Sequence, residues 1–573
     1  MAIEIREHTV STARLSGGHA LMRALIDNDV TTIFGYPGGA IMPTYDALYY
    51  YRDQIRHVLV RHEQGATHAA EGYARVTGRP GIVLVTSGPG ATNTLTGIAD
   101  ALMDSTPMLV ISGQVARPFI GTQAFQEAPV IDTVRPLTKW CYQVQSASEI
   151  PAVVNRAFLI ATSGRPGPVL IDIPKDVQSE PAYDINTNGI DRSNSITFTP
   201  ETLNQLQQAA NLLNEAQKPF ILAGHGVLIS KATEELRALA EQAGIPVANT
   251  LLGLSSFPQD HPLFVGMLGM HGRYGANILT NQADVILAVG MRFDDRVTGK
   301  VSEYAKQARI IHVDIDPTQL NRIIKAEIAI NADAKTALSV LLERVMVNQH
   351  SDWLSQFRQL DEVENEQVTR KILAADTPEL TMAEVADLLS RKTSGEAVVV
   401  ADVGQHQMVA AQRYRATKPN SFITSGGMGT MGFALPAAIG AKIGAPDREV
   451  VAAIGDGSFQ MTEQELGTIA QEGVSVKIII LDNGYLGMVR QWQDRFFEGR
   501  RSFVDMKNPD FVMIANAYGI PAEKVQTRVR LNGALGRMLA SGESYLLHIK
   551  VAQEENVFPM IPPGAAVDEV VLN

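Results

Sequence analysis

The chain has 573 residues, of which 45% are hydrophobic and 19% charged, and its formal net charge is −12. This composition is typical of a folded globular protein and excludes disordered and fibrous classes. At roughly 150 residues per domain, the length predicts about three or four domains. The acidic residues are scattered and there is no basic block, so nucleic acid is not an expected partner.

One cysteine, Cys141, cannot form an internal disulfide bond, which fits a reducing compartment. The first residues lack the apolar core of a signal peptide. The longest apolar runs have the length of a strand and are too short to cross a bilayer. We therefore expect a cytoplasmic protein with no membrane partner.

Short β-branched apolar runs alternate with helical patterns along most of the chain. The predicted strands are His57–Val60, Gly81–Thr86, Met108–Ser112, Val169–Ile173, Pro219–Ala223, Val285–Val289, Ile310–Val313, Ala397–Ala401, Val450–Ile454 and Val476–Leu481. The predicted helices include Arg14–Asn28, Ala91–Asp104, Pro200–Ala216, Thr233–Ala243 and Thr462–Gln471. This alternation predicts an α/β fold of doubly wound parallel sheets, each offering a ligand site at the carboxyl ends of its strands.

Two polar segments, Gln178–Thr199 and Asn348–Thr377, are interpreted as linkers, although the second also fits a surface helix. They divide the chain into three α/β domains of similar size. The predicted boundaries are 1–185, 195–345 and 375–555, followed by a C-terminal tail at 556–573.

The most informative motif follows two neighbouring predicted strands near the C-terminus. Gly455-Asp456-Gly457-Ser458 follows the strand that ends at Ile454, and Asp482-Asn483 follows the strand Val476–Leu481. The spacing accommodates one helix and the next parallel strand, so we expect Asp456 and Asn483 at the same edge of one sheet. Carboxylate and amide oxygens suit Mg²⁺, which completes its shell with phosphate and water, and the glycines allow close approach of a diphosphate. The alternative is two ordinary acidic turns.

This GDGS and LDN pair resembles the metal-binding motif of thiamine-diphosphate enzymes. The resemblance implies that Asp456, Asn483 and the backbone carbonyl of Tyr485 bind Mg²⁺. That family usually has Asn-Asn where this chain has Asp482-Asn483, so the implied ligand is kept and its neighbour differs.

Further segments of this resemblance imply the other contacts of thiamine diphosphate. Met431 would support the bent cofactor, unless it only fills the core. The residues implied to contact the cofactor are Val403, Gly404, Gln405, His406, Met428, Met431, Gly455, Gly457 and Ser458.

Glu63 follows the strand His57–Val60 and begins a helix rich in small residues, which can pack closely against another surface such as a partner subunit. Considered alone, Glu63 is better explained as an acidic residue favoured by the helix dipole. In the family that it resembles, a glutamate here shares a proton with ring nitrogen N1′ of thiamine and activates the cofactor. There the glutamate and the metal motif come from different subunits, so the resemblance implies at least a dimer.

Many ordered segments narrow the resemblance to the catalytic subunits of acetohydroxyacid synthases, also called acetolactate synthases. They are FGYPGGAIMP, RHEQ, TSGPGATN, AFQE, SGRPGPVLIDIPKDV, GMLGMHG, VGMRFDDRVTG, DIDP, DVGQHQM and GMVRQWQ. The family decarboxylates pyruvate and joins the remaining unit to a second pyruvate or to 2-oxobutyrate, giving 2-acetolactate or 2-aceto-2-hydroxybutyrate. This is the first common step of valine, leucine and isoleucine biosynthesis. The resemblance also implies a homodimer or tetramer and a small regulatory subunit.

In this family Arg292 would bind the carboxylate of the acceptor through its planar fork; the alternative is an ion pair with Asp294 or Asp295. Trp492 would pack beside the alkyl group of the acceptor and favour 2-oxobutyrate by about 1–3 kcal/mol, unless it is a core residue. The remaining implied pocket residues are Gly39 near the reacting carbonyl, Phe125 and Gln126 in its lining, and Lys175 near the place where substrate enters. Lys175 is explained equally well as a surface lysine after a strand.

A glycine turn in the middle of the chain suggests a second cofactor. Gly224-His225-Gly226 follows the strand Pro219–Ala223 and is a weak phosphate-binding signal by itself. Asp314 and Asp316 end another strand and are candidates to hold a ribose hydroxyl. The family binds FAD in this domain, and the further residues implied are Arg165, His271, Arg292, Asp294 and Asp333. Because the reaction has no net redox change, we expect the flavin to be structural.

Two other interpretations compete with this one. Within the same superfamily, a pyruvate oxidase, a 2-keto acid decarboxylase and a glyoxylate carboligase are the closest alternatives. Glu63 counts against the carboligase, and Arg292 with Trp492 counts against simple decarboxylases. A non-catalytic flavoprotein or a regulatory paralogue of the same fold would be expected to have lost Glu63, Asp456 or Asn483.

Overall fold

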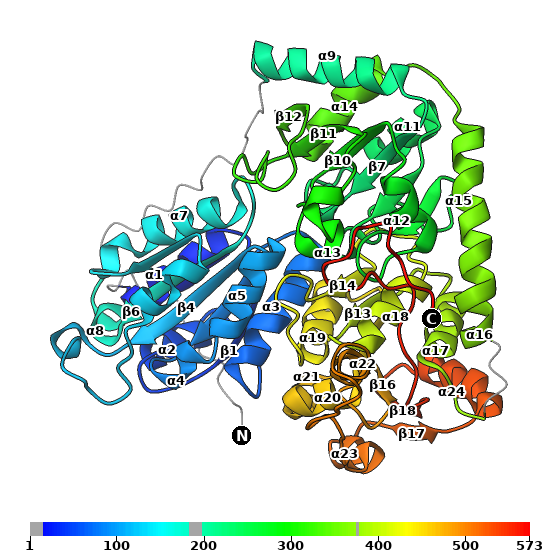
Figure 1. Cartoon of the computed structure of the whole chain (residues 1–573). Helices are drawn as coiled ribbons and strands as arrows, with labels where there is room; N and C mark the ends of the chain where they lie inside the picture. Colours follow the sequence, from blue (N-terminus) through cyan, green and yellow to red (C-terminus); the bar gives the residue numbers. More distant parts are fainter. Residues whose placement is uncertain (1–14, 183–197, 374–377) are drawn as a thin grey trace. The chain divides into compact units, whose positions relative to one another are not determined.

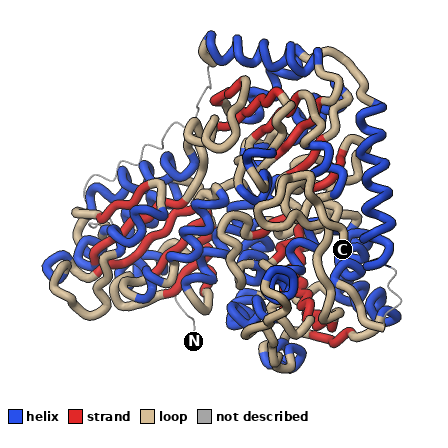
Figure 2. Tube along the Cα trace, in the orientation of Figure 1, coloured by secondary structure: helices blue, strands red, loops and turns tan. Residues whose placement is uncertain are grey.

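The computed structural model describes residues 15–182, 198–373 and 378–573, and these form three six-stranded sheets whose paired strands all run parallel. Figure 2 shows the three groups of strands flanked by helices. Internal contacts divide the chain into two compact units: Met1–Glu71 with Pro80–Ser193, and Gly72–Arg79 with Asn194–Asn573. The predicted α/β class of three doubly wound parallel sheets is confirmed.

The first unit contains one sheet, in the order β2-β1-β3-β4-β6-β5. Figure 1 labels three of its strands, β1, β4 and β6. Its strands are β1 Thr32–Tyr36, β2 Arg56–Leu59, β3 Gly81–Val85, β4 Met108–Gln114, β5 Trp140–Gln143 and β6 Pro168–Pro174. Its helices are α1 Gly17–Asp27, α2 Met42–Tyr49, α4 Pro89–Thr92, α5 Leu95–Asp104, α6 Val130–Val134, α7 Ile150–Thr162 and α8 Lys175–Ser179, and α3 Glu63–Thr77 begins here. Apolar residues of α1, α2 and α7 form one core with the strands.

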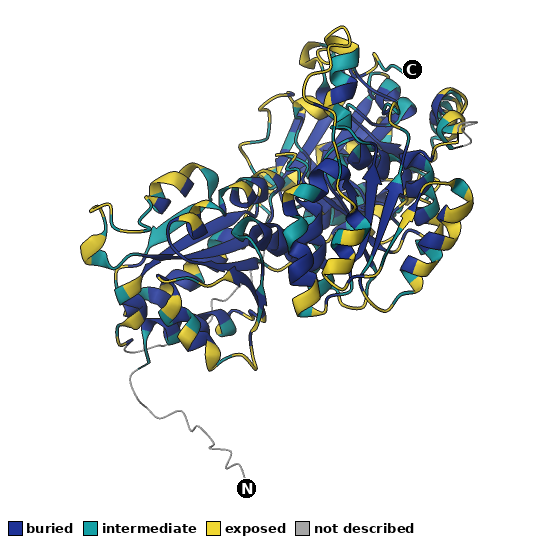
Figure 3. Cartoon of the chain, turned by 90° about the horizontal axis from the view of Figure 1, so that it is seen from below, coloured by how far each residue is buried: buried dark blue, intermediate teal, exposed yellow. Residues whose placement is uncertain are grey.

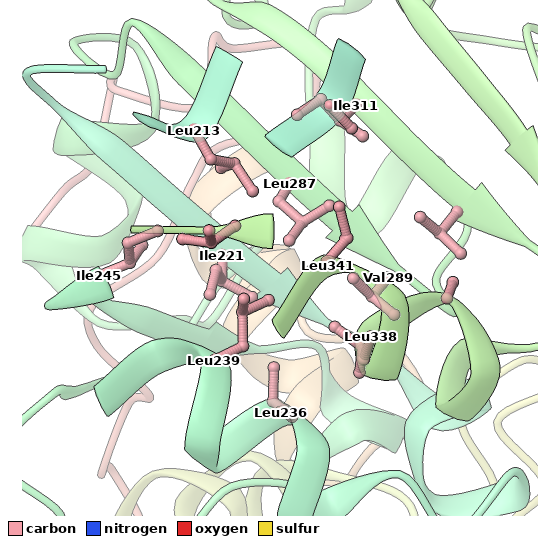
Figure 4. Packing of buried hydrophobic residues seen from close by; sticks show 14 of the residues in the cluster. Leu213, Ile221, Leu236, Leu239, Ile245, Leu287, Val289, Ile311, Leu338 and Leu341 are labelled. Atoms are coloured by element: carbon pink, nitrogen blue, oxygen red, sulfur yellow. The ribbon is translucent and has the colours of Figure 1, made fainter. Parts of the chain in front are cut away.

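The second sheet, in the middle of the chain, has the order β12-β11-β10-β7-β8-β9. Its strands are β7 Pro219–Ala223, β8 Val247–Asn249, β9 Phe264–Met267, β10 Val285–Val289, β11 Arg309–Asp314 and β12 Ile328–Asn331. Its helices are α9 Pro200–Glu215, α10 His225–Ile229, α11 Thr233–Ala243, α12 Tyr274–Thr280, α13 Asp295–Thr298 and α14 Ala334–Arg344. Leucines of α9, α11 and α14 pack on the strands (Figure 4). Counted from the first strand of this sheet, the order is 3-2-1-4-5-6, which is the order of dinucleotide-binding folds.

The third sheet has the order β14-β13-β15-β16-β18-β17. Its strands are β13 Val398–Ala401, β14 Phe422–Thr424, β15 Val450–Gly455, β16 Lys477–Asp482, β17 Ala522–Val525 and β18 Tyr545–Lys550. Its helices are α17 Met382–Thr393, α18 Gln405–Arg413, α19 Ala434–Gly444, α20 Asp456–Thr462, α21 Leu466–Glu472, α22 Gly487–Phe496, α23 Phe511–Ala517 and α24 Arg528–Ala540. Counted from its own first strand, this sheet repeats the 2-1-3-4-6-5 order of the first sheet.

The central strands are buried along their whole length, as Figure 3 shows by the dark strands beneath exposed helix surfaces. All six residues of β15 and of β16 are buried. Parallel strands covered on both faces require continuous apolar runs, which explains why these strands were predictable from sequence. None of the described helices is long and apolar enough to span a membrane.

The alternative interpretation of Asn348–Thr377, a helix, is observed for most of the segment, and its role as a linker between domains stays a prediction. Helix α15 runs over Ser351–Glu364, and a π-helical turn joins it to α16, Arg370–Leu373. Trp353 and Phe357 lie one turn apart and are buried, and Trp353 Nε1 donates to the carbonyl of Pro219 at 2.9 Å. Because α15 also carries many charged residues, the sequence of this segment was interpreted as polar and this apolar pair was not recognised.

The structure describes only the ends of the other predicted linker, Gln178–Thr199, and it describes the whole predicted tail, 556–573. Within Gln178–Thr199, α8 extends to Ser179, Thr199 caps α9, and residues 183–197 lie outside the described part of the chain. In the tail, Ile561 N donates to the carbonyl of Met270 at 2.8 Å. The tail therefore packs on the middle sheet region, and the predicted domain boundaries stay predictions.

The small residues of α3 allow a close contact inside the second unit. A Cβ placed on Gly72 would lie 1.9 Å from the carbonyl oxygen of Ala437 in α19. We expect Gly72→Ala to lower the stability by about 1–3 kcal/mol, because the helices must move apart. The melting temperature would show this loss.

Gly536 in α24 provides a matched control for this substitution. Only the flexible Lys392 Nζ, at 3.8 Å, lies near a Cβ placed there. Gly536→Ala should therefore raise stability by about 0.5–1 kcal/mol, the gain expected from replacing an unconstrained helical glycine. Equal shifts for the two variants would contradict the proposed contact.

Candidate active site

Asp456 and Asn483 lie at one edge of the third sheet, as their spacing predicted. Strands β15 and β16 are adjacent and parallel, with Gly455 opposite Leu481, so the turns that follow them are neighbours. Both side chains are buried. Asp456 Oδ2 accepts hydrogen bonds from Gly484 N at 3.0 Å and Asn508 Nδ2 at 2.6 Å. Asn483 Oδ1 accepts from Tyr485 N at 3.1 Å.

These donor atoms fit a hard cation. Burial raises the pKa of Asp456 to about 6, so a carboxylate here carries a desolvation cost that a bound cation would offset. A carboxylate and an amide oxygen are ligand types that Mg²⁺ prefers. The residues present therefore fit the implied magnesium site.

Asp482 replaces the first Asn of the usual Asn-Asn pair. Its carboxylate contacts side chains of β18. Its Oδ2 lies 2.6 Å from His548 Nε2 and 2.8 Å from Lys550 Nζ. Burial alone would raise its pKa, but the hydrogen bonds from His548 and Lys550 hold the pKa of Asp482 well below its usual range. Its charge is therefore balanced by side chains of β18.

The segment after β13 lies beside this edge. Gly404 has a φ of 149°, a conformation that favours glycine. The buried Gln405 donates from Nε2 to Gln491 Oε1 and to the carbonyl of Glu555, both at 2.9 Å, and accepts from Asn483 Nδ2 at 3.3 Å. Its amide therefore connects the implied metal ligand Asn483 to α22 and to the segment that follows β18.

His406 and Ser458 complete the contacts of this segment. A Cβ placed on Gly455 would lie 2.6 Å from His406 Cε1, so the glycine leaves room for the imidazole. Burial lowers the pKa of His406 to about 3, and the ring is neutral at physiological pH. Ser458 Oγ donates to the carbonyl of Val403 at 3.3 Å.

Asp402 is a residue of this edge that the sequence analysis missed. It is buried, and its carboxylate accepts from Gly432 N at 3.0 Å and Ala434 N at 2.8 Å. Burial raises its pKa. Asp402 thereby anchors the segment that carries Met431. The sequence signal that could have identified Asp402 is a carboxylate directly after the apolar run AVVVA.

The two methionines of this segment differ in environment. Met431 is partly buried, and a Cβ placed on Gly457 would lie 3.7 Å from its Cε and 2.9 Å from Leu486 Cδ2. Met431 therefore lies over the start of α20, and its role as a support for the cofactor stays a prediction. Met428 is 48% exposed and packs on less of the chain.

In the first unit, the predicted residues lie at the carboxyl edge of one sheet. Gly39 follows β1 in an exposed turn, Glu63 begins α3 after β2, and Lys175 begins α8 after β6 and is exposed. Asn93, which the sequence analysis did not single out, donates from Nδ2 to Glu63 Oε2 at 2.9 Å. Glu63 is partly buried and remains compatible with the helix-dipole explanation as well.

A short loop brings Gln126 to the same edge. Glu127 accepts hydrogen bonds from Gly121 N and, at 3.1 Å, from Ala124 N, which closes the loop. Gln126 has a φ of 60°, and its Cβ lies 3.0 Å from a Cβ placed on Gly88, in the turn after β3. Phe125 is 89% exposed, so within this unit it lines no enclosed pocket.

The middle sheet reverses its strand order between β7 and β10, where dinucleotides bind in such folds. A Cβ placed on Gly224 would lie 2.3 Å from Gly290 O, and one on Gly226 would lie 2.6 Å from Gly290 Cα. These glycines are therefore required by the close packing of two strand ends. His225 lies between the two glycines and is the first residue of the short helix α10.

The predicted acidic residues of this domain also follow its strands. Asp294 caps α13 through Arg296 N and Val297 N at 3.1 and 3.2 Å. Asp333 caps α14 through Thr336 N at 3.1 Å. Helix capping therefore accounts for part of their hydrogen bonding.

The pair Asp314 and Asp316 ends β11 and begins the turn after it. Asp314 Oδ1 accepts from Asp316 N at 2.8 Å, and Asp316 Oδ1 accepts from Thr318 N at 3.0 Å. His271 is buried in the same domain, and burial lowers its pKa to about 4.

Arg292 makes the ion pair that was its alternative explanation. Its Nη2 lies 3.8 Å from Asp294 Oδ2, and its side chain is 28% exposed. This long contact leaves the guanidinium accessible. Trp492 on α22 is partly buried and packs edge-on against Phe496 with ring centroids 5.4 Å apart.

Arg165 belongs to the first unit, unlike the other predicted flavin residues. Its Nε donates to Ser105 Oγ at 2.8 Å, and its Nη2 donates to the carbonyls of Leu102 and Met103 at 3.2 and 3.0 Å. These contacts place the cation at the C-terminus of α5, where it interacts favourably with the helix dipole.

Comparison with known proteins agrees with this arrangement. Residues 15–134, 206–341 and 402–549 match, in order, the N-terminal TPP binding domain, the central domain and the C-terminal TPP binding domain of thiamine pyrophosphate enzymes. The fold and the paired edge residues thus define a thiamine-diphosphate enzyme.

Curated relatives narrow this class. The Acetolactate synthase isozyme 2 large subunit of Escherichia coli (strain K12) is 45% identical over 558 residues, covering 97% of this chain and 99% of the relative. The Acetolactate synthase large subunit of Lactococcus lactis is 43% identical with 97% and 96% coverage. Acetolactate synthase 1, chloroplastic, of Nicotiana tabacum is 44% identical with 97% and 84% coverage. The chain belongs to the acetolactate synthase large-subunit family.

Proposed function

We propose that this chain is the catalytic subunit of an acetolactate synthase, which decarboxylates pyruvate and joins the two-carbon unit to a second pyruvate or to 2-oxobutyrate. The observation that carries the proposal is the buried Asp456–Asn483 pair on adjacent strand ends, within a chain that is 42–45% identical to such enzymes along nearly its whole length. Bound thiamine diphosphate would supply the nucleophilic carbon and accept the electrons released with carbon dioxide.

Residues of the protein would activate thiamine diphosphate, bind its metal ion and hold the cofactor in place. Glu63, oriented by Asn93, would hold a proton at ring nitrogen N1′ of thiamine. Asp456, Asn483 and the carbonyl of Tyr485 would bind Mg²⁺, and Met431 would support the cofactor. Val403, Gly404, Gln405, His406, Met428, Gly455, Gly457 and Ser458 would surround it.

Arg292 and Trp492 would select the acceptor. Arg292 would bind its carboxylate in place of the long contact to Asp294. Trp492 would pack beside its alkyl group. The remaining pocket residues would be Gly39, Phe125, Gln126 and Lys175.

We further propose that FAD binds the middle domain in a structural role. The 3-2-1-4-5-6 strand order supports this. The proposed residues are Arg165, Gly224, His225, Gly226, His271, Arg292, Asp294, Asp314, Asp316 and Asp333. The proposed assembly is a homodimer or tetramer with a small regulatory subunit, because the similar E. coli and L. lactis proteins are described as large subunits.

Incubation of the purified protein with pyruvate tests the activity. We expect acetolactate as the product, formed only when both thiamine diphosphate and Mg²⁺ are added, from a protein with a flavin absorption spectrum. Acetaldehyde or acetyl phosphate as the main product would contradict the proposal in favour of a decarboxylase or an oxidase.

The proposed role of Trp492 predicts a change in acceptor preference. Trp492→Leu should reduce the preference for 2-oxobutyrate over pyruvate by up to about 10–200-fold, because a contact with one methylene is worth only about 1–3 kcal/mol. The product ratio in a competition between both acceptors measures this. Trp140→Leu, at a partly buried tryptophan of β5, should leave the ratio unchanged.

A further inference from the structure

Asn508 lies between the two carboxylates that follow β15 and β16. Its Nδ2 donates to Asp456 Oδ2 at 2.6 Å and to Asp482 Oδ1 at 3.0 Å. Gly484 N donates to the same two oxygens at 3.0 and 3.1 Å. Two donors are thus shared by two carboxylates, which links the turns after both strands.

The orientation of the Asn508 amide is itself determined. Gln460 Nε2, on α20, donates to Asn508 Oδ1 at 3.0 Å, so the amide nitrogen faces the carboxylates. The loop that carries Asn508 is attached to the same turn, because Met506 N donates to Gly484 O at 2.8 Å. The amide therefore has little freedom to rotate.

The charge of Asp482 is balanced from the neighbouring strand. Lys550 lies opposite Asp482 in the register of β16 and β18, and both Lys550 and His548 contact its Oδ2. Asp482 is thus a fixed acceptor for Asn508. Asp456 has no such cation partner among the described residues, and no described side chain donates to its Oδ1. Its Oδ1 is therefore the oxygen available to a cation.

We propose that Asn508 is a positioning residue, which holds Asp456 Oδ2 so that Oδ1 faces Mg²⁺, and that Asp482 holds Asn508 in turn. This inference rests on the proposed metal role of Asp456. It also explains why an aspartate is tolerated beside Asn483: its charge is used within the protein to fix the ligand.

The proposal predicts a specific defect in metal binding. Asn508→Leu removes both donated hydrogen bonds at similar volume. It should weaken Mn²⁺ binding, measured by electron paramagnetic resonance with Mn²⁺ in place of Mg²⁺, by about 10–100-fold, the usual effect of losing a partner of a metal ligand. The Mg²⁺ concentration for half-maximal activity should rise in parallel, while kcat at saturating Mg²⁺ stays within about threefold of the unmodified protein.

Two further variants keep the test decisive. Asn516→Leu changes an exposed asparagine of α23 and should leave Mn²⁺ affinity unchanged. Gln460→Leu frees the Asn508 amide to rotate without removing it, and it also removes the hydrogen bond from Gln460 Nε2 to the carbonyl of Asp456 at 3.2 Å. It should weaken Mn²⁺ binding less than Asn508→Leu does, because the Asn508 amide is still present. It provides the answer if Asn508→Leu fails to fold.

The outcomes separate this inference from the proposed function. Unchanged Mn²⁺ affinity in folded Asn508→Leu, or an equal loss in Asn516→Leu, would overturn the positioning role. If Asp456→Asn abolishes Mn²⁺ binding while Asn508→Leu does not alter it, the metal site stands and only the role of Asn508 fails. If Asp456→Asn also leaves Mn²⁺ binding intact, the metal site itself is wrong.

Discussion

Glu63→Gln is expected to lower kcat for acetolactate formation by about 10²–10⁴-fold, the usual contribution of a proton-transferring side chain. The amide keeps the size of the carboxyl group and can still contact Asn93, which now donates to Glu63 Oε2 at 2.9 Å. It cannot share a proton with ring nitrogen N1′. Cofactor affinity, measured by fluorescence quenching, and the flavin spectrum should change little.

Glu201→Gln tests the competing explanation for Glu63. Glu201 is exposed in the first turn of α9, so its replacement removes the same charge from an equivalent helix position. If Glu63 acts only through the dipole of α3, both variants should show small stability losses of about 0.3–1 kcal/mol and normal turnover. Normal turnover in Glu63→Gln would therefore refute its catalytic assignment.

Asp456→Asn should have a comparably large effect at the metal site. The substitution removes the single carboxylate of the proposed ligand set, so we expect Mg²⁺ affinity to fall by at least about 100-fold, beyond the loss typical of an outer partner. Activity should decline with it, and a large excess of Mg²⁺ should restore part of the cofactor binding.

The exposed Asp505 offers the control for this loss of charge. Its backbone pairs with Tyr485, but its side chain faces solvent. Asp505→Asn should leave the Mg²⁺ requirement unchanged. A similar rise in both variants would indicate a general electrostatic effect and would count against direct ligation by Asp456.

The predictable part of the fold consists of fully buried strands. Pro219–Ala223 and Val285–Val289 were predicted with the observed ends because continuous apolar runs stop abruptly at the sheet edge. Strand β17, Ala522–Val525, was missed because it lies at the edge of its sheet, where charged residues such as Glu523 and Lys524 are tolerated.

The position of a site residue could be predicted from the sequence where that residue directly follows a strand. Asp456 and Asn483 are in such positions, so their shared edge could be predicted from spacing alone, whereas the role of Glu63 was implied by the family resemblance. Asn508 lies in a loop far along the chain, and its contact with Asp456 depends on how that loop folds back. No local pattern around Asn508 carries this information.

The matching strand orders of the first and third sheets allow their edges to be compared position by position. The turn after β3, with Thr86, is the counterpart of the turn after β15, with Asp456, and the turn after β2, with Glu63, is the counterpart of the turn after β14, with Ser425. At these two positions, the residue that carries proposed chemistry in one sheet is matched by a residue of a different kind in the other. Such a division of labour between two topological copies is the pattern that duplication of one ancestral domain, followed by specialisation of each copy, would produce.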